Sequence, residues 1–271
     1  MFVGLLDFDS IIYKAVYRVV GIDEMREAID AYGKDTAKEW LNELVIERGM
    51  KRCNASVEEI DMYLSNHFET PIDFYEIFVT KCSKSFRKEL APSYKSNRKR
   101  NKYVSLLRNH FMFEMDAIYD DVYEADDLIA DRARALRDDC IVISIDKDLK
   151  TIGGYYWSYY KQPLKDDDGE YYLNDFGGKE QFYKQREVMY IEKDEADRLF
   201  WIQMLEGDTS DNIKGVKGIG AVGAKKIINN ATSNFVSTAR TYIKKNQKDD
   251  FWINYELLRL GSRELNENKL N

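Results

Sequence analysis

Four clusters of acidic residues, each next to an apolar run, restrict the folds that are open to this chain. The clusters are Asp7 with Asp9, Glu124 with Asp126 and Asp127, Asp146 with Asp148, and Asp208 with Asp211. Carboxylates that converge repel one another and are costly to desolvate, so a fold tolerates them mainly where a hard cation neutralises them. The pattern therefore predicts that the clusters meet at one magnesium or manganese site.

The apolar runs are typical of buried strands, and helical patterns lie between them. Strands are expected at 3–8, 74–80 and 140–145, and helices at about 35–48, 124–137 and 193–205. This alternation predicts an α/β fold with a mainly parallel sheet flanked by helices. Ligands of such sheets bind beyond the carboxyl ends of the strands, where Asp7 and Asp146 are placed. The tyrosine-rich segment 151–177 predicts a hairpin at the edge of the core, with a turn at Asp166–Gly169.

The composition limits the classes of protein to consider. A chain of 271 residues with 44% hydrophobic and 33% charged residues is typical of one large or two coupled folded domains. We expect a cytoplasmic protein without a membrane partner, because there is no 18-residue apolar run and no basic leader. Three widely spaced cysteines and two histidines do not favour a disulfide framework, a zinc knuckle or a histidine-based triad.

Basic residues are segregated from the acidic clusters, although the net charge is −7. Residues 81–102 contain nine Lys or Arg and one acid, Glu89, with Phe86 and Tyr94 among them and Tyr103 directly after them. Cations interleaved with aromatic rings suit a single nucleic-acid strand. A solvated charged face is the alternative interpretation.

The sequence GVKGIG at Gly215–Gly220 has the form of a helix–hairpin–helix. Glycines permit a tight turn, and the N–H groups at the start of the next helix can face a phosphate. Lys225 and Lys226 would lie in that helix close to the phosphates that they neutralise. Such a hairpin binds the DNA backbone and does not read bases. A plain glycine turn is the alternative.

Taken together, SFRKELAPSYKSNRK, YEADD, SIDKDL and GDTSDNIKGVKGIG resemble the successive motifs of the flap endonuclease and 5′-exonuclease superfamily. The stand-alone enzymes of tailed phages and the 5′-nuclease domains of bacterial DNA polymerase I are the most similar members. The resemblance spans roughly residues 3–230. It implies a PIN-like nuclease core at 1–192 with a basic helical arch at about 81–114. A helix–hairpin–helix subdomain and C-terminal helices would follow at 193–271.

The resemblance also implies an activity and its partners. The chain would be a monomeric two-metal 5′-3′ exonuclease and flap endonuclease with RNase H activity, which acts in phage DNA replication or recombination. Its substrates would be DNA with a 5′ end, flap or nick, and RNA–DNA hybrids. The cofactors would be two Mg²⁺ or Mn²⁺ ions, with K⁺ at the hairpin. In such a reaction, two ions activate water and stabilise the leaving oxygen without a protein nucleophile.

Individual residues receive roles from the same resemblance. One metal ion would be held by Asp7, Glu124 and Asp126, with Asp127 nearby, and the second by Asp146, Asp148, Asp208 and Asp211. Lys95 and Arg98 would be catalytic and contact the scissile phosphodiester. The residues expected to bind DNA are Arg87, Lys88, Tyr94, Lys99, Lys217, Gly218, Gly220, Lys225 and Lys226.

One position departs from the family pattern. The strand before the arch usually ends in another metal-binding aspartate, but this chain has Thr80 there. Thr80 offers only a neutral hydroxyl, and Asp9 is the extra acid that would compensate. The substitution leaves open a DNA-binding protein of the same fold whose catalytic site has decayed.

A phosphatase of the haloacid dehalogenase type is the other alternative. In the sequence DFDS, Asp7 would be its nucleophile and Asp9 its general acid. Ile11 stands where that family has Thr or Val, and Asp208 and Asp211 are closer together than in its later acidic motif. This interpretation also gives no role to the basic segment or the hairpin.

Overall fold

A computed structural model describes residues 1–68, 71–81, 83–159, 162–163, 183–184 and 187–262. The elements of the first half are β1 (Val3–Asp7), α1 (Phe8–Val16), α2 (Ile22–Tyr32), α3 (Lys34–His67), β2 (Phe74–Phe78), α4 (Phe86–Leu90), α5 (Lys102–Glu114) and α6 (Ala125–Leu136). Those that follow are η1 (Arg137–Asp139), β3 (Cys140–Ile143), η2 (Lys147–Ile152), β4 (Gly154–Trp157), β5 (Gln162–Pro163), β6 (Tyr183–Lys184) and β7 (Met189–Ile191). The C-terminal elements are α7 (Lys193–Glu206), β8 (Gly207–Asp208), β9 (Ile213–Lys214), α8 (Ala221–Asn229), α9 (Asn234–Lys244) and α10 (Lys248–Leu258).

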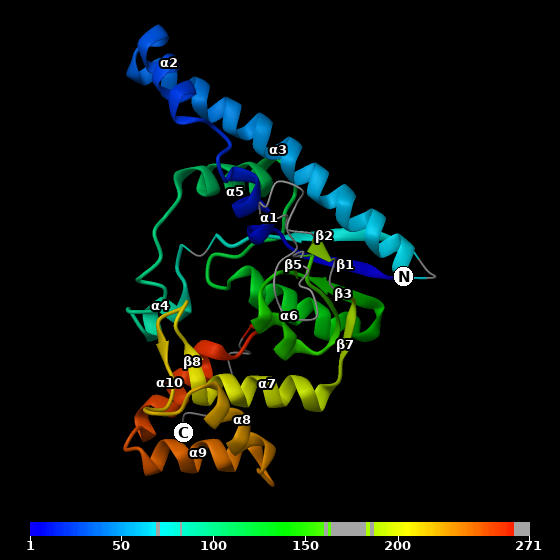
Figure 1. Cartoon of the computed structure of the whole chain (residues 1–271), viewed down its shortest axis with the longest axis vertical. Coiled ribbons are helices and arrows are strands. Elements are labelled where there is room, and N and C mark those ends of the chain that lie inside the picture. The colour runs from blue at the N-terminus through cyan, green and yellow to red at the C-terminus, as the bar shows by residue number, and fades with distance from the viewer. Residues whose placement is uncertain (69–70, 82, 160–161, 164–182, 185–186, 263–271) are drawn as a thin grey trace, which may run out of the picture.

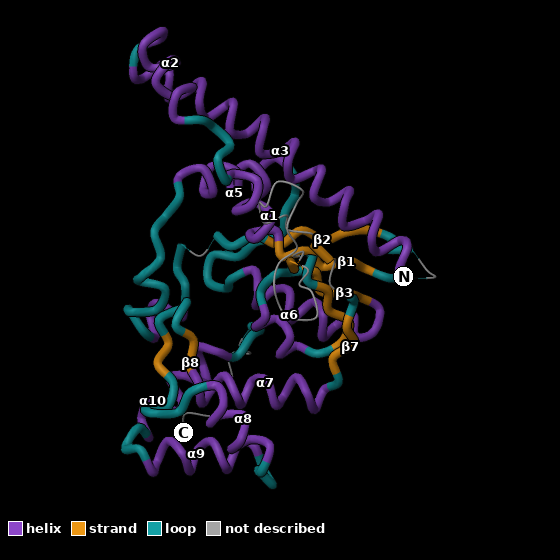
Figure 2. Tube along the Cα trace, viewed as in Figure 1, coloured by secondary structure: helices purple, strands orange, loops and turns teal. Residues whose placement is uncertain are grey.

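The centre of the molecule is a five-stranded sheet in the order β2-β1-β3-β4-β7 (Figure 2). The first four strands are parallel, and β7 pairs with β4 in the antiparallel direction. All five residues of β1 are buried, as expected for an inner strand of a sheet covered on both faces. The predicted α/β fold with a mainly parallel sheet is therefore confirmed.

Helices cover the two faces of the sheet (Figure 1). Leu6 points into a core shared with α1, α3 and α5, whereas Val3 and Leu5 point into a second core shared with α6. This division follows from the alternation of side chains along a strand. The carboxyl ends of β1 and β3 lie at the same edge of the sheet, because the two strands are parallel neighbours.

Two segments differ from the sequence-based expectations. The helix expected at about 35–48 continues to His67, and its Gly49 lies where a Cβ would come within 2.8 Å of a Leu107 methyl carbon. That glycine permits close approach of α5 and does not end the helix. Segment 151–177 is not simply an edge hairpin, because β4 pairs with β3 inside the sheet. The predicted turn at Asp166–Gly169 lies outside the described residues.

Helix α2 was not predicted, and with the start of α3 it forms a hairpin that projects beyond the sheet (Figure 1). Arg48 of α3 holds this hairpin through hydrogen bonds of 2.8 and 2.9 Å to the two carboxylate oxygens of Glu24 and a hydrogen bond to the Val19 carbonyl.

Within the described part of the chain, no helix is long and apolar enough to cross a membrane.

A third hydrophobic core lies among the C-terminal helices α7 to α10, with Met204, Leu205 and Tyr242 at its centre. Tyr94, from the segment before α5, also packs into this core. Helix α7 begins at Lys193, next to the expected boundary between residues 192 and 193. The division into a nuclease core and a separate subdomain stays a prediction, because the cores share residues of both parts.

Candidate functional site

The carboxyl ends of β1 and β3 bring Asp7 of the first acidic cluster and Asp146 of the third together. Asp7 is the last residue of β1, and Asp146 lies three residues after the end of β3. Ser144 links them, because its Oγ donates to Asp7 Oδ2 at 2.5 Å and accepts from the Asp146 backbone N–H at 2.9 Å. Tyr156 supports this link by donating its hydroxyl to the carbonyls of Ser144 and Asp146.

Helix α6 adds Glu124 and Asp126 to the site. Glu124 is the N-cap residue, and Asp126 lies in the first turn, where the helix dipole favours negative charge. Asp126 lines one pocket with Glu124 and Asp146.

The last two clusters come from η2 and from the turn after α7. Asp148 and Asp208 share a side-chain hydrogen bond, and the Asp148 backbone N–H donates to Asp146 Oδ1 at 2.9 Å. Asp208 Oδ1 accepts from the Ser210 backbone N–H at 2.7 Å, which shapes the turn that carries Asp211. One pocket joins these elements, and its polar lining consists of Arg87, Tyr94, Glu124, Asp126, Asp146, Asp148, Gln203 and Asp211.

Burial and mutual repulsion raise the pKa of several of these carboxyl groups. The pKa of Asp7 rises to about 7, mainly through burial and then through the nearby Asp9. Burial, followed by repulsion from Asp146, likewise raises the pKa of Asp148 to about 7. The pKa of Asp126 lies well above its ordinary value through burial and the charges of Asp7 and Asp146. This is the electrostatic signature of a site that favours a cation.

The segment before α5 supplies that positive charge. Lys95 Nζ lies 2.6 Å from Glu124 Oε2 and 3.6 Å from Asp211 Oδ2, and Arg98 pairs with Asp211. Although burial acts to raise the pKa of Glu124, Lys95 and Arg87 hold it below its ordinary value. The structure therefore places the two predicted catalytic cations directly against the acidic clusters.

The type of donor in the pocket fits hard divalent cations, which prefer carboxylate oxygens. The spacing is not that of a preformed metal site: among the described residues, no group of three or more His, Cys, Asp or Glu side chains is arranged to hold an ion. Glu124 and Asp211 instead bind Lys95 and Arg98. Binding of a divalent ion through these carboxylates would require them to release Lys95 and Arg98.

The structure corrects three predicted roles. Asp127 does not face the pocket carboxylates, because its two oxygens accept from the Arg87 guanidinium at 2.5 and 2.7 Å. Arg87 is 1% exposed and Tyr94 is 3% exposed, so neither is available to DNA. The Tyr94 hydroxyl instead donates to Glu124 at 2.9 Å and to Asp211 at 3.0 Å.

Asp9 and Thr80 are also occupied by other contacts. Asp9 accepts from Arg108 Nε at 2.6 Å and from the Thr80 backbone N–H at 3.2 Å. The Thr80 hydroxyl accepts from the Ala125 backbone N–H at the start of α6. Asp9 therefore does not compensate for the missing aspartate by turning toward the pocket, since Arg108 holds it.

The glycine-rich segment before α8 has one feature that requires glycine. Gly218 has a φ of +80°, and Gly220 is the N-cap residue of α8.

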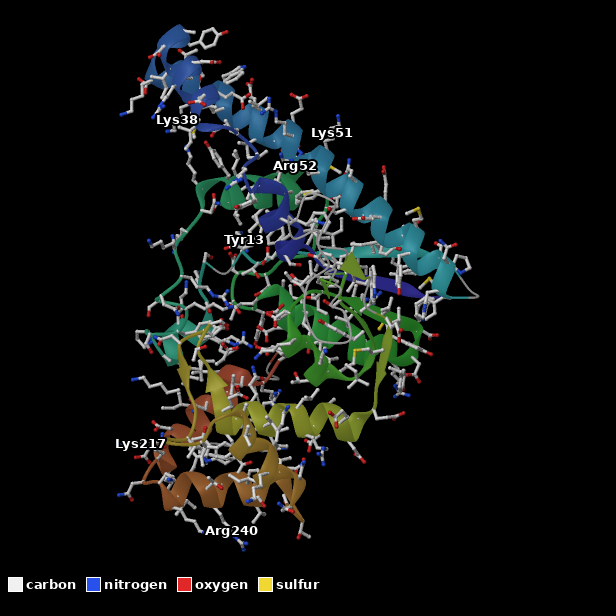
Figure 3. All side chains as sticks on the ribbon, viewed as in Figure 1. Tyr13, Lys38, Lys51, Arg52, Lys217 and Arg240 are labelled. Atoms are coloured by element: carbon white, nitrogen blue, oxygen red, sulfur yellow. The ribbon has the colours of Figure 1, made fainter. Side chains whose placement is uncertain are left out.

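The lysines that were expected to bind DNA are exposed. They are Lys217, Lys225 and Lys226 near this turn, and Lys88 and Lys99 in the predicted arch. Lys217 lies beside the C-terminal helices in Figure 3, on the opposite side of the sheet from α3. Their DNA-binding roles stay predictions.

Sequence analysis missed several residues of the site, namely Ser144, Gln203, Arg108, Asn97 and Asn212. Ser144, Asn97 and Asn212 stand inside or next to the acidic and basic motifs, and that proximity was the available signal. Arg108 gave none, because its partner Asp9 is distant in sequence.

No family model matches the chain. A curated 5′-3′ exonuclease of Mycoplasmopsis pulmonis is 33% identical over 113 residues, a match that covers 41% of this chain and only 33% of that protein. The bacteriophage T5 flap endonuclease, in a complex with DNA and metal ions, aligns with a TM-score of 0.58 at 15% identity, over 95% of this chain and 89% of that one. The zinc-bound T5 5′-exonuclease aligns with a TM-score of 0.54 at 15% identity, over 95% and 88%.

These comparisons confirm the resemblance to the flap endonuclease and 5′-3′ exonuclease superfamily. The likeness in fold to the T5 enzyme extends over nearly the whole chain. The likeness in sequence to the curated exonuclease extends over 113 residues.

Proposed function

We propose that this chain is a metal-dependent 5′-3′ exonuclease and structure-specific flap endonuclease that acts on DNA. The observation that carries the proposal is that Lys95 pairs with Glu124 and Arg98 with Asp211, two carboxylates that line the pocket with Asp126, Asp146 and Asp148. A phosphodiester is an anion, so it needs cations beside any metal-binding carboxylates. Relatives of the same fold include a flap endonuclease bound to DNA and metal ions.

In this proposal the chain's own residues hold the ions and orient the phosphate. Asp7, Glu124 and Asp126 would hold one divalent ion, and Asp146, Asp148, Asp208 and Asp211 a second. The chemistry supplied by such bound ions is activation of water and neutralisation of phosphoryl charge. Lys95 and Arg98 exchange their carboxylate partners for the scissile phosphate and offset the charge that develops on it.

The exposed lysines extend the proposal to substrate binding. Lys88 and Lys99 would contact a single strand near the arch base, and Lys217, Gly218, Gly220, Lys225 and Lys226 would contact the duplex backbone. A K⁺ ion at this hairpin and activity on RNA–DNA hybrids belong to the same proposal, as does a role in phage replication or recombination. The 5′-3′ direction rests on the resemblance.

The phosphatase alternative loses support from the position of Asp9. A general acid must be free to give a proton to the leaving group, but Asp9 is bound by Arg108 and the Thr80 N–H. The decayed-site alternative is tested directly by activity.

The experiment is cleavage of 5′-labelled flap, nicked and RNA–DNA hybrid substrates with Mg²⁺, Mn²⁺ or EDTA. We expect cleavage with either ion and none with EDTA, and the product lengths separate exonuclease from flap action. Binding without cleavage in both metals would leave only the decayed DNA-binding protein. Hydrolysis of a small phosphate monoester instead would support the phosphatase.

A further inference from the structure

Two turns that are distant in sequence lie against each other at the pocket. The arch-base turn, residues 93–98, carries Lys95 and Arg98, and the acidic turn, residues 208–212, carries two of the carboxylates. Their backbones are bonded directly, because the Lys95 N–H donates to the Asp211 carbonyl at 2.9 Å. The predicted catalytic cations and one predicted metal cluster are therefore parts of a single contact.

Two asparagine side chains cross this contact in opposite directions. Asn212 Nδ2 donates from the acidic turn to the Ser93 carbonyl at 2.9 Å and to Ser96 Oγ at 3.3 Å. Asn97 Nδ2 donates from the arch-base turn to the Thr209 carbonyl at 3.2 Å. Neither amide contacts a carboxylate of the pocket, so each holds the opposite turn and not a charged group.

The backbone of Lys95, in the arch-base turn, is strained. Lys95 has a φ of +53° and Asn212 a φ of +59°, both in the left-handed region. Asparagine enters this region readily, but lysine does so rarely. A strained conformation of this kind persists only where the surrounding structure determines it. The hydrogen bonds between the two turns hold Lys95 in this conformation.

We propose that Asn97 and Asn212 are positioning residues that form an amide clamp between the two turns. The clamp fixes the distance from Lys95 and Arg98 to the carboxylates of Asp208 and Asp211. The role in turnover rests on the proposed nuclease function, whereas the clamp itself can be tested without activity. Neither residue touches the substrate in this proposal.

The first test is hydrogen exchange measured by mass spectrometry in EDTA, where no cleavage occurs. Asn212→Ala should increase amide exchange in residues 93–98, and Asn97→Ala should increase it in residues 208–212. The matched control is Asn66→Ala, which removes an exposed amide bonded to the Met62 carbonyl on α3. Unchanged exchange in both turns of both variants would overturn the clamp, whether or not the chain is a nuclease.

The second test is single-turnover cleavage of a 5′-flap substrate with Mg²⁺ and saturating enzyme. Each clamp variant should cleave about tenfold more slowly, because small misplacements of positioned groups are costly. Binding of the same substrate in EDTA should stay within about twofold, since the clamp does not contact DNA. Asn66→Ala should match the parent chain in both measurements.

A double-mutant cycle separates positioning from general loosening of the fold. In a Lys95→Ala background, Asn212→Ala should slow cleavage by only about threefold or less, because the main positioned group is gone. An equal slowing in both backgrounds would overturn the positioning role. If the parent chain does not cleave at all, the proposed nuclease function and this role fall together, and hydrogen exchange still decides the clamp.

Discussion

The guanidinium of Arg87 forms a buried bidentate ion pair with Asp127, with Nη1 2.5 Å from Oδ2 and Nη2 2.7 Å from Oδ1. The same guanidinium donates to the carbonyls of Leu257 and Arg259, and Asp127 also accepts from the Gly261 N–H. One pair therefore joins α4, α6 and the end of α10. Because Glu124 is the N-cap residue of α6, this pair helps to hold the pocket carboxylate of Glu124 in place.

Arg87→Ala should destabilise the chain by about 3–5 kcal/mol, because it leaves the Asp127 charge buried without its partner. The measurement is urea unfolding followed by circular dichroism. The paired substitution Arg87→Met with Asp127→Leu should recover much of the loss, since no buried charge remains. A loss below about 1 kcal/mol, together with weaker DNA binding, would restore the DNA-contact role that the sequence suggested.

The sequence predicted the acidic centre well where simple geometry determines it. Asp7 and Asp146 end adjacent parallel strands, and such strands bring their carboxyl ends to one edge. Helix geometry could likewise have shown that Asp126 and Asp127 have different roles. Neighbouring residues of a helix point about 100° apart, so both cannot face one ion. The pairing of Asp127 with Arg87 shows which of the two turns away.

Burial in the basic segment could not be predicted from its charge. A run of cations with aromatic residues is typical of an exposed nucleic-acid surface, but Arg87 and Tyr94 point inward. Their partners Asp127 and Glu124 come from α6, and Leu257 comes from α10. Such long-range pairing leaves no periodic signal in the local sequence. The place of β4 inside the sheet was not predicted for a related reason, because its four residues lie within a longer tyrosine-rich segment that was expected to form an edge hairpin.

Asp146→Ala and Asp208→Ala should each abolish metal-dependent cleavage and leave DNA binding in EDTA largely intact. The expected loss is more than about 100-fold in rate, as for other groups that stabilise the charge that develops in the transition state. The measurements are single-turnover cleavage and fluorescence anisotropy with the same flap oligonucleotide. Near-normal turnover by either variant would remove these residues from the proposed metal site.

Lys95→Ala should lower the cleavage rate much more than the affinity for DNA. Lys95 lies 2.6 Å from Glu124 in the protein alone, and in the reaction it would stabilise the phosphoryl charge. We expect a rate loss of about 100-fold or more, with affinity changed by less than about threefold. Lys51→Ala, on the exposed part of α3, is the control. A loss confined to affinity would mean that Lys95 only binds DNA.

The double substitution Lys225→Ala with Lys226→Ala should weaken duplex binding for all sequences alike. Each exposed lysine that contacts a phosphate releases about one counterion, so the slope of log K against log salt should fall by about two. Anisotropy titrations at several KCl concentrations measure this slope. An unchanged slope would place the duplex elsewhere on the protein and favour a plain glycine turn at Gly215–Gly220.

Asp7→Asn should stabilise the metal-free chain at neutral and higher pH. The folded pKa of Asp7 is about 7 against an ordinary value of 3.8, so between these pH values the folded state holds a proton that the unfolded state has lost. Since the folded state binds more protons there, the free energy of unfolding falls as pH rises from about 4 to about 7. The variant removes this contribution and should be more stable by at least about 1 kcal/mol at pH 8 in EDTA.

Urea unfolding at pH 4, 6 and 8 in EDTA tests the effect, with Glu114→Gln, an exposed carboxyl on α5, as the control. The gain of the Asp7 variant over the parent should be near zero at pH 4 and greatest at pH 8, because the Asp7 charge is costly only once it has formed. Burial also raises the pKa of Asp148 to about 7, so the test is the difference between the two chains at each pH and not the pH dependence of either chain alone. A gain that is the same at all three pH values would show that the substitution acts through packing and not through the buried charge.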